Sequence, residues 1–571
     1  MKQQHAFRKA ALAAAIASLG LCALTGAAAA PVEHVLIISV DGLHSVDAER
    51  FIATHPESAL AELAEHAVRY TTAATSRPSD SFPGVLSILT GGSPASADVF
   101  YDVSWDRTQW PPGPAKCTGT QGQQTTYDET IDLLIVDSRG LAIDQNRINP
   151  DLLPWGIKDG SCQHIYPHDF VKVNTVFDVV KHGHSGRTAW ADKHAAYDLV
   201  TGPTGKAVDD LYTPEVTNPE TLNDSSGNPI PGPYDGDYGV VVDAKGTHVT
   251  RDATVSVLCT LDNDKRKFDA LVAEINGYDH TGKGAQVGTP VLFGTDLQAI
   301  SVGQKVSLNN TDGTCFAPDP AGLNGTPGGY VDGSGTPTAV LEYALEQTDA
   351  QLGRVVAALK QRHLYDSTLI VISAKHGQTP IDPLSVNPPN APTNKIGGLQ
   401  GLVSAYVTAN PPVNSPAAQA IINAGENEDD IALIWLLAAD QSKAADAAQW
   451  LREYSVAAGL HIQQVLAGDL LKLRFRDPTT DNHTPDIIVV PQPGTIYTTS
   501  TKKNAEHGGF SNDDTNVALI VSKPGIREKV IKGAVLTTQI APTVLRALDL
   551  DPGELQSVQI EHTEVLPGLG L

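Results

Sequence analysis

Ser81 is the strongest candidate nucleophile in this sequence. It lies in the segment Thr75-Ser-Arg-Pro-Ser-Asp-Ser-Phe-Pro-Gly84, where Pro83 fits the first turn of a short helix that Gly91 ends. The free N–H groups and the dipole at a helix N-terminus favour an anion, so they would favour the alkoxide of Ser81 over its alcohol. Serine is also a preferred N-cap, so this segment alone leaves open a purely structural role for Ser81.

Three further polar residues stand at glycine-containing turns next to strand-like apolar segments. Asp41 follows the buried-strand pattern of Val32–Val40, and His376 follows that of Leu369–Ile372. His507 opens the turn His-Gly-Gly. Carboxylate and imidazole can hold a catalytic zinc ion that would activate the serine and neutralise a phosphoryl oxygen, although each histidine taken singly could be structural.

The elements around these residues have the pattern of an open α/β sheet, in which ligands bind at the carboxyl ends of the strands. Neighbouring parallel strands would place Asp41 and Ser81 on one edge. We expect helices at 46–66, 174–182, 338–361, 442–458 and 536–549, and further strands at 187–190, 297–302, 369–372, 470–475, 485–490 and 517–521.

Two stretches differ from this pattern and are interpreted as insertions. Residues 100–170, rich in Gly, Pro, Asp and Trp, would form an irregular wall over the sheet edge, and residues 385–480 an inserted α+β cap. Between them, Ala191-Asp-Lys-His194 is another polar cluster at a predicted strand end, which makes Asp192 and His194 site candidates.

Composition limits the possible partners. The chain has 571 residues and a net charge of -25, which argues against nucleic-acid or anionic-membrane partners. A small anionic substrate is compatible with this charge if a metal ion inverts the local field. No segment after the N-terminus has the length and apolarity of a membrane span.

The N-terminus has the pattern of a signal peptide, residues 1–30. Lys2, Arg8 and Lys9 precede an apolar stretch and the cleavage site Ala27-Ala-Ala-Ala30, with an uncleaved anchor as the alternative. We therefore expect a periplasmic or secreted protein. Four cysteines would remain, and of the three possible pairings we favour Cys117–Cys162 with Cys259–Cys315.

The motifs, taken in order, resemble the alkaline phosphatase superfamily and within it the type I phosphodiesterase and nucleotide pyrophosphatase branch. They are the strand ending in Asp-Gly, the Ser-Phe-Pro loop with its Thr-Gly helix end, the strand ending in His-Gly, the late His-Gly-Gly and the helix at Gln539-Ile-Ala-Pro-Thr-Val-Leu. The resemblance implies a three-layer α/β sandwich around a mostly parallel sheet in residues 31–571, with an inserted cap subdomain.

The resemblance also assigns roles by position. It implies that Ser81 is the nucleophile, that Asp41, Ser81, His376 and His507 bind metal, and that Asp102 lies near the phosphoryl group. His194 is our second candidate for substrate binding. The implied cofactor is a divalent metal, zinc first, with the number of ions open between one and two.

The sequence departs from the family pattern at two places. Lys375 stands where the family has the Asp of Asp-His-Gly, and the family's Asp-x-x-x-His pair is not visible before the 338–361 helix. A charged lysine cannot bind a metal, but Lys375 could stabilise the charge that a second ion would otherwise neutralise, so we count it as catalytic.

We therefore predict an exported, metal-dependent hydrolase of phosphodiester or pyrophosphate bonds in a small phosphorylated substrate, acting through a phosphoserine at Ser81. One alternative is a phosphomonoester, phosphonate or sulfate ester hydrolase on the same fold. Another is a non-catalytic exported binding protein with a decayed metal site. The oligomeric state stays open.

Overall fold

The computed structural model describes residues 30–570 with gaps at 127–130, 132–134, 137–141, 145–147, 184–185, 215–240, 243–247, 250–252, 310–318, 390 and 499. Apart from Ala30, the predicted signal peptide lies outside the described residues, so its cleavage stays a prediction. Across the described part of the chain, no helix is both long and apolar enough to span a bilayer.

One eight-stranded sheet forms the centre of the molecule, and five neighbouring strands in it, from β11 to β15, are parallel. Strand β22 is antiparallel to both of its neighbours, β15 and β2. The order is β11 (Asp210–Tyr212), β10 (Thr188–Ala191), β14 (Leu292–Leu297), β1 (His34–Val40), β15 (Thr368–Ser373), β22 (Ile520–Ser522), β2 (Ala67–Tyr70) and β23 (Lys529–Ile531).

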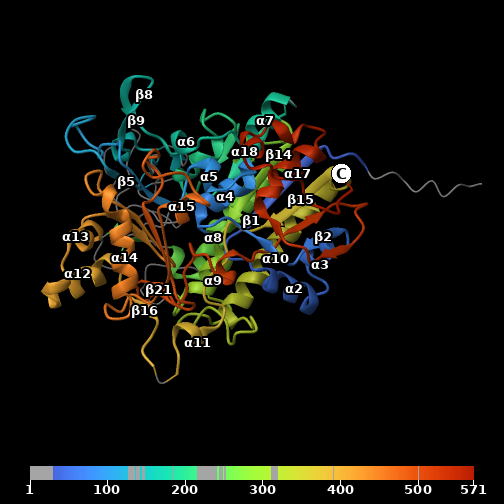
Figure 1. Cartoon of the computed structure of the whole chain (residues 1–571). Helices are drawn as coiled ribbons and strands as arrows, with labels where there is room; N and C mark the ends of the chain where they lie inside the picture. The colour runs from blue at the N-terminus through green and yellow to red at the C-terminus, as the bar shows by residue number, and fades with distance from the viewer. Residues whose placement is uncertain are drawn as a thin grey trace, which may run out of the picture.

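Helices cover both faces of this sheet, which confirms the predicted three-layer α/β architecture (Figure 1). Val35 and Ile37 of β1 belong to one hydrophobic core, and Leu36 and Ile38 to the other. Both faces of β1 are therefore buried, which explains its unbroken apolar sequence. The first core includes α4 (Ser81–Thr90), α7 (Val176–Gly183) and α17 (Ile540–Ala547); the second includes α2 (Ser45–Thr54), α3 (Ala59–Ala64), α8 (Val257–Ile275), α9 (Ala299–Lys305) and α10 (Ala339–Gln361).

A second, four-stranded sheet with its own helices forms a separate lobe, which we call the cap lobe, at the left of Figure 1. Its strands are β17 (Gly425–Glu428), β18 (Ala432–Trp435), β20 (Ile487–Pro491) and β19 (Ile462–Ala467), and its helices α12 (Leu399–Ala409), α13 (Pro416–Ile422) and α14 (Ala444–Tyr454). The sequence placed residues 485–490 in the main sheet, which is wrong. Strand β20 is buried on both faces, by a different core on each, and so has the pattern of a main-sheet strand.

Three other predicted elements differ from the structure. The predicted strand at 297–302 is instead the end of β14 and most of α9, and the one at 470–475 overlaps the short helix α15 (Asp469–Lys472). Short apolar runs do not distinguish strand from helix by periodicity alone. The predicted helix at 46–66 is two helices, α2 and α3, because the chain turns at His55-Pro56, where proline cannot continue a helix.

The segment at 100–170 contains short antiparallel pairs rather than long elements. Its hairpins are β4 (Val103–Asp106) with β5 (Gln123–Thr126), and β8 (Trp155–Lys158) with β9 (Ser161–His164). The Cys117–Cys162 disulfide is confirmed. Cys259 is also disulfide-bonded, but Cys315 lies outside the described residues, so that pairing stays a prediction.

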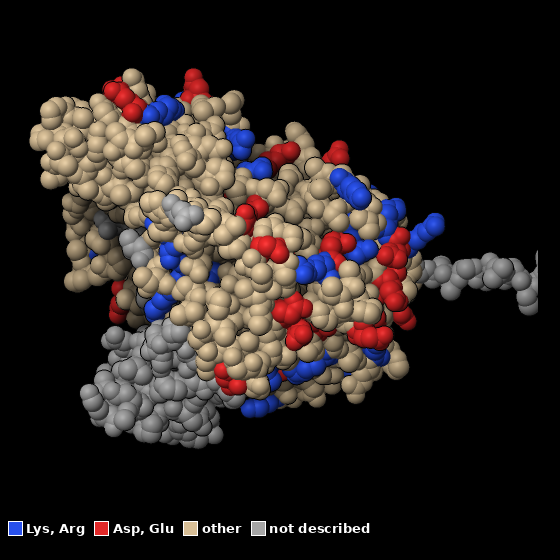
Figure 2. Space-filling view, turned by 90° about the horizontal axis from the view of Figure 1, so that it is seen from below, with Lys and Arg blue, Asp and Glu red and all other residues tan. Residues whose placement is uncertain are grey.

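Acidic and basic side chains are interspersed over the right half of the face shown in Figure 2. The net charge of -25 is therefore not gathered into one acidic patch on that half of the face.

His483 joins the cap lobe to the segment that follows α5 (Pro94–Ala97). Its Nδ1 lies 2.9 Å from Asp98 Oδ2, its Nε2 lies 2.8 Å from Asp106 Oδ2, and its ring stacks on Phe170. Burial alone would lower the pKa of His483, but the two carboxylates outweigh burial and raise the pKa to about 9.

This raised pKa predicts a pH-dependent stability. The imidazolium should stabilise the fold fully below the unfolded pKa of about 6.5, and this stabilisation, roughly 3 kcal/mol, should be lost as pH rises through about 9. In urea denaturation at pH 6 and pH 10, His483→Gln should remove most of this difference, whereas the exposed His66→Gln should keep it. An unchanged pH dependence in His483→Gln would contradict the prediction.

Candidate active site

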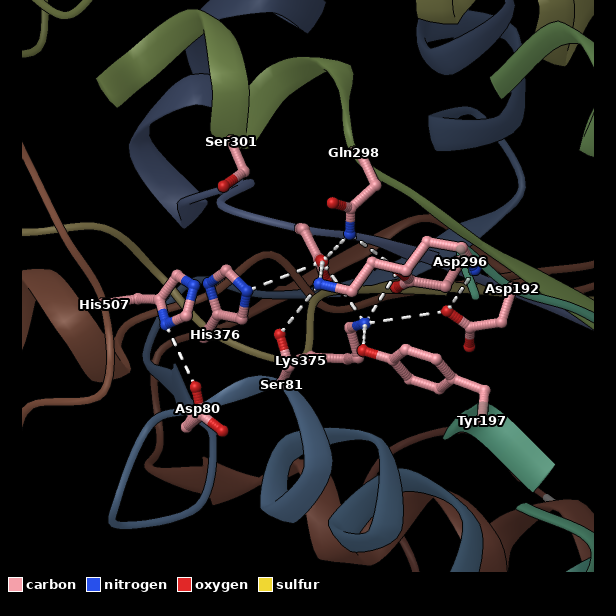
Figure 3. A network of polar contacts seen from close by, with 12 residues as sticks. Asp80, Ser81, Asp192, Tyr197, Asp296, Gln298, Ser301, Lys375, His376 and His507 are labelled. Atoms are coloured by element: carbon pink, nitrogen blue, oxygen red, sulfur yellow. Dashed lines mark hydrogen bonds and ion pairs between the residues drawn. The ribbon is translucent and has the colours of Figure 1, made fainter. Parts of the chain in front are cut away.

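Four neighbouring parallel strands each bring one charged side chain to the same edge of the main sheet. Asp192 follows β10 and Asp41 follows β1, while Asp296 is the penultimate residue of β14. Lys375 comes two residues after the end of β15. Because ligands of open α/β sheets bind at the carboxyl ends of the strands, this edge is the candidate active site (Figure 3).

Lys375 lies at the centre of this group and is fully buried. Its Nζ lies 2.8 Å from Asp296 Oδ2 and 3.2 Å from Asp41 Oδ2. It also donates a hydrogen bond of 2.7 Å to the hydroxyl of Tyr197 and lies 3.9 Å from Asp192 Oδ1. Lys375 is therefore a buried ionic centre and not a surface lysine.

The charges around Lys375 shift one another strongly. Burial alone would lower the pKa of Lys375, but Asp296 and Asp41 raise it well above its usual value. For Asp41 the effects are reversed. Burial alone would raise its pKa, but Lys375 and His376 hold the pKa well below its usual range. Burial and the charge of Asp41 raise the pKa of Asp296 well above its usual value. Lys375 and Asp41 are thus an ionised pair at neutral pH.

Ser81 is the first residue of α4, as predicted. Asp80 occupies the N-cap position without a side-chain capping hydrogen bond, and Ser81 lies one residue inside the helix, beyond the capping position. The Lys193 ammonium lies 3.3 Å from Ser81 Oγ and 4.0 Å from Asp41 Oδ2. The candidate nucleophile therefore has a helix N-terminus and an ammonium group beside it, which both favour its alkoxide.

Two histidines lie on the other side of Ser81 from Asp192 (Figure 3). His376 Nε2 is 3.5 Å from Asp41 Oδ2, and His507 Nδ1 is 3.2 Å from Asp80 Oδ1. The centroids of the two imidazole rings are 3.9 Å apart. Burial, followed by the charge of His376, lowers the pKa of His507 well below its usual value, so that this imidazole is neutral.

The two predicted substrate-binding residues, Asp102 and His194, contact neighbours of these groups. The backbone N–H of Asp102 donates a 2.8 Å hydrogen bond to Asp80 Oδ2, and burial with the charge of Asp80 raises the pKa of Asp102 to about 7. The His194 ring packs edge-on against Tyr197, with ring centroids 4.9 Å apart. A contact of either residue with substrate stays a prediction.

Four residues of the site were missed by the sequence analysis. Gln298 donates hydrogen bonds to Asp41 Oδ2 and, at 3.3 Å, to Asp296 Oδ2. Asp296, Lys193 and Tyr197 make the contacts described above. Asp296 could have been found at the end of the apolar run Val291-Leu-Phe-Gly-Thr-Asp296, but the strand was predicted too late in the sequence, at 297–302.

Ser81 and Asp41 do come together, but not through neighbouring strands. Strand β2, before the Ser81 loop, is separated from β1 by β15 and β22. Helix α4 reaches the edge because its backbone packs directly on the chain after β15. A Cβ on Gly84 would lie 2.2 Å from the carbonyl oxygen of Lys375, so only glycine permits this approach.

The family model for type I phosphodiesterase / nucleotide pyrophosphatase matches residues 35–130 and 164–514. The chain belongs to this family. Its members are hydrolases that act on phosphoric ester bonds. The predicted assignment to the alkaline phosphatase superfamily and its type I phosphodiesterase branch is therefore confirmed.

One solved structure, an alkaline phosphatase, supports the predicted fold. The wild-type alkaline phosphatase PafA is 14% identical, with a TM-score of 0.56, and the match covers 92% of this chain and 97% of PafA. Mouse ectonucleotide pyrophosphatase / phosphodiesterase 5 is 11% identical, with a TM-score of 0.47, and the match covers 91% of this chain and 96% of that protein. No curated protein matches this chain.

Among the described residues, the chain does not present the ligands of a two-metal centre. The family's Asp-x-x-x-His pattern begins at Asp296. Four residues later, where the pattern has histidine, this chain has Ile300, a buried core side chain that cannot bind metal. The other carboxylate position is Lys375. A divalent ion 4 Å from its ammonium would be repelled by roughly 8 kcal/mol at an effective dielectric constant of 20.

A one-metal centre is also incompletely provided. Three buried side-chain atoms of a kind that binds zinc make no hydrogen bond: Asp41 Oδ1, His376 Nε2 and His507 Nδ1. They do not converge, however. Across the ranges that the structure describes, the one set of three His, Cys, Asp or Glu ligand atoms within 4.8 Å of one another is His55 with Glu342 and Glu346, outside this site.

Gly84→Ala should disturb the site without removing any charged group. The added methyl group would overlap the Lys375 backbone, so helix α4 must shift, and we expect the free energy of unfolding to fall by about 1–3 kcal/mol and turnover to fall with it. Gly401→Ala is the control, because no atom lies within 4 Å of its Cβ and alanine should stabilise α12 by about 0.5–1 kcal/mol. Urea denaturation and steady-state kinetics of both variants test this, and a Gly84→Ala protein of wild-type stability would contradict it.

Proposed function

We propose that this chain is an exported hydrolase of phosphodiester or pyrophosphate bonds that acts through a phosphoserine at Ser81. The observation that carries the proposal is the position of Ser81 Oγ, at the N-terminus of α4 and 3.3 Å from the Lys193 ammonium. Residues 31–571 would act as one catalytic domain with the cap lobe as an insertion. The substrate would be a small phosphorylated molecule.

The reaction would proceed in two displacements. Ser81 Oγ forms a bond to phosphorus, the bond from phosphorus to the leaving-group oxygen breaks, and the leaving group takes up the proton that the serine hydroxyl releases. Water then attacks the phosphoserine, the Ser81 Oγ–phosphorus bond breaks, and the serine regains its proton. Negative charge builds up on the non-bridging oxygens in both steps, and positioned cations stabilise that charge.

The remaining roles follow from position. Lys375 would hold Asp41 and Asp296 in place and contribute positive charge, while Asp102 and His194 would support the substrate through Asp80 and Tyr197. The divalent ion predicted from the sequence, zinc first, on Asp41, Ser81, His376 and His507, stays a prediction. Export to the periplasm or beyond is supported by the Cys117–Cys162 disulfide.

The covalent intermediate is the direct test of this function. Rapid acid quenching of the enzyme with bis(4-nitrophenyl) phosphate, followed by peptide mass spectrometry, should find a nitrophenyl phosphate ester on the peptide that contains Ser81. A turning-over enzyme in which another residue carries the group, or none does, would refute the proposed nucleophile. Parallel assays with phosphomonoester, phosphonate and sulfate ester substrates decide the bond type.

A non-catalytic binding protein is the second candidate, favoured by Lys375 and Ile300 at two positions where the family pattern has metal ligands. It predicts saturable binding of phosphate esters without any turnover. The quench experiment separates the two functions, because a binding protein would retain its bound ester intact and leave Ser81 unmodified.

A further inference from the structure

Two acidic side chains at positions where the family pattern has metal ligands here share one ammonium group. The Lys375 Nζ lies 3.2 Å from Asp41 Oδ2 and 2.8 Å from Asp296 Oδ2, within ion-pair distance of both. Lys375 is anchored from behind by the hydroxyl of Tyr197 at 2.7 Å. The ammonium group is therefore a fixed, covalently attached cation between the two carboxylates.

A second ammonium group stands where the nucleophile acts. Lys193 Nζ lies 3.3 Å from Ser81 Oγ and 4.0 Å from Asp41 Oδ2, and Lys193 directly follows Asp192 at the end of β10. The Lys193 side chain keeps 11% of its surface exposed, so it is less completely buried than Lys375. A tetrahedral oxyanion held at Ser81 would contact this ammonium and the free N–H groups at the start of α4.

The two lysines together cover the two tasks of a pair of metal ions. One task is to neutralise the carboxylate of Asp41 at the end of β1, which Lys375 performs through a direct contact. The other is to stabilise the serine alkoxide and the oxygens bound to phosphorus, for which Lys193 is in place. Lys375 and Ile300 stand at two further positions where the family pattern has metal ligands.

We propose that the ammonium groups of Lys375 and Lys193 replace the metal ions of this site, and that the site binds a tetrahedral phosphate oxyanion with no divalent ion present. The oxyanion site consists of Lys193, Ser81 and the N-terminus of α4. This inference rests on the proposed function for the identity of the bound group, but it is tested by binding and metal content as well as by turnover.

The first experiment measures metal directly. The mature protein is incubated with excess zinc, freed of unbound ions by gel filtration and analysed by inductively coupled plasma mass spectrometry. We expect less than about 0.1 zinc per chain in the wild type. In Lys375→Asp, which removes the ammonium and adds a carboxylate beside Asp41 and Asp296, we expect about one zinc per chain. One or two zinc ions per wild-type chain would overturn the inference.

The second experiment measures binding of inorganic phosphate by isothermal titration calorimetry, with and without EDTA. We expect the same affinity in both buffers and at least tenfold weaker binding in Lys193→Met, which keeps the length of the side chain. The exposed Lys265→Met, on α8, is the charge-matched control and should bind like wild type. Loss of phosphate binding in EDTA, or wild-type binding by Lys193→Met, would overturn the inference.

The outcomes also separate this inference from the proposed function. A protein that holds stoichiometric zinc and is inactivated by Ser81→Ala would refute the lysine replacement and keep the hydrolase. A zinc-free protein that binds phosphate through Lys193 but forms no Ser81 ester would keep the lysine site and refute the hydrolase.

Discussion

Replacing Ser81 by alanine is expected to lower the turnover of an activated phosphodiester by roughly 10³-fold or more. The reason is chemical, since the covalent intermediate cannot form without the hydroxyl. The change should leave the fold intact, because Asp80 is the N-cap of α4 and the Ser81 hydroxyl makes its one side-chain contact, among the described residues, with Lys193. Steady-state kinetics and circular dichroism of the purified variant test both statements.

Ser87→Ala is the matched control on the same helix. Its hydroxyl is also buried, but it donates a 2.7 Å hydrogen bond to the Gly84 carbonyl and contacts the hydroxyl of Thr537, away from the charged site. We expect a loss of about 1 kcal/mol in stability and turnover within about threefold of wild type. A Ser81→Ala enzyme with turnover similar to that of Ser87→Ala would exclude Ser81 as the nucleophile.

The fold could be predicted from the sequence where burial leaves a regular pattern. Strand β1 is apolar throughout because both of its faces contact a core, and the long helix α10 keeps its apolar positions on one face. The same pattern misled the prediction at β20, which is buried on both faces within the cap lobe. An apolar pattern indicates that both faces of a strand are buried, but it does not indicate which sheet the strand belongs to.

The position of a site residue could be predicted where a polar side chain stands at a recognisable turn after a strand or before a helix. Asp41, Ser81, Lys375, His376 and His507 all lie at the sheet edge, as expected, and His507 is joined to the group through Asp80 and the His376 ring.

Asp296, Lys193 and Tyr197 could not be placed in the same way. Asp296 belongs to a strand whose limits were misjudged, and Lys193 was part of a noted polar cluster without a role. Tyr197 comes from the short helix η2 (Ala195–Thr201), and only the three-dimensional packing brings its hydroxyl to Lys375. Contacts of this kind depend on side-chain reach across a sheet edge, which local sequence does not encode.

Lys375→Met should be the most damaging substitution to the structure of the site. It removes the ammonium but keeps most of the side-chain volume, so Asp41 and Asp296 are left buried without their cation. Breaking a buried ion pair from one side typically costs about 3–5 kcal/mol in the free energy of unfolding. Turnover should fall by about 10²–10³-fold in the fraction that folds, because the positive charge beside the reacting group is lost as well.

Lys267→Met separates these two effects. Lys267 is a lysine of α8 that is equally buried and pairs with Asp264 at 2.9 Å. Within the part of the chain that the structure describes, it makes no hydrogen bond or ion pair with Ser81, Asp41 or Asp296, although its charge lowers the pKa values of Asp192 and Asp296. Its replacement should therefore cost a comparable amount of stability but leave turnover per folded molecule within about tenfold of wild type. Urea denaturation and active-fraction-corrected kinetics of the two variants give the comparison. Equal turnover losses in both would mean that Lys375 acts only by holding the fold, whereas a stable and active Lys375→Met would show that the ammonium does not hold the carboxylates together at all.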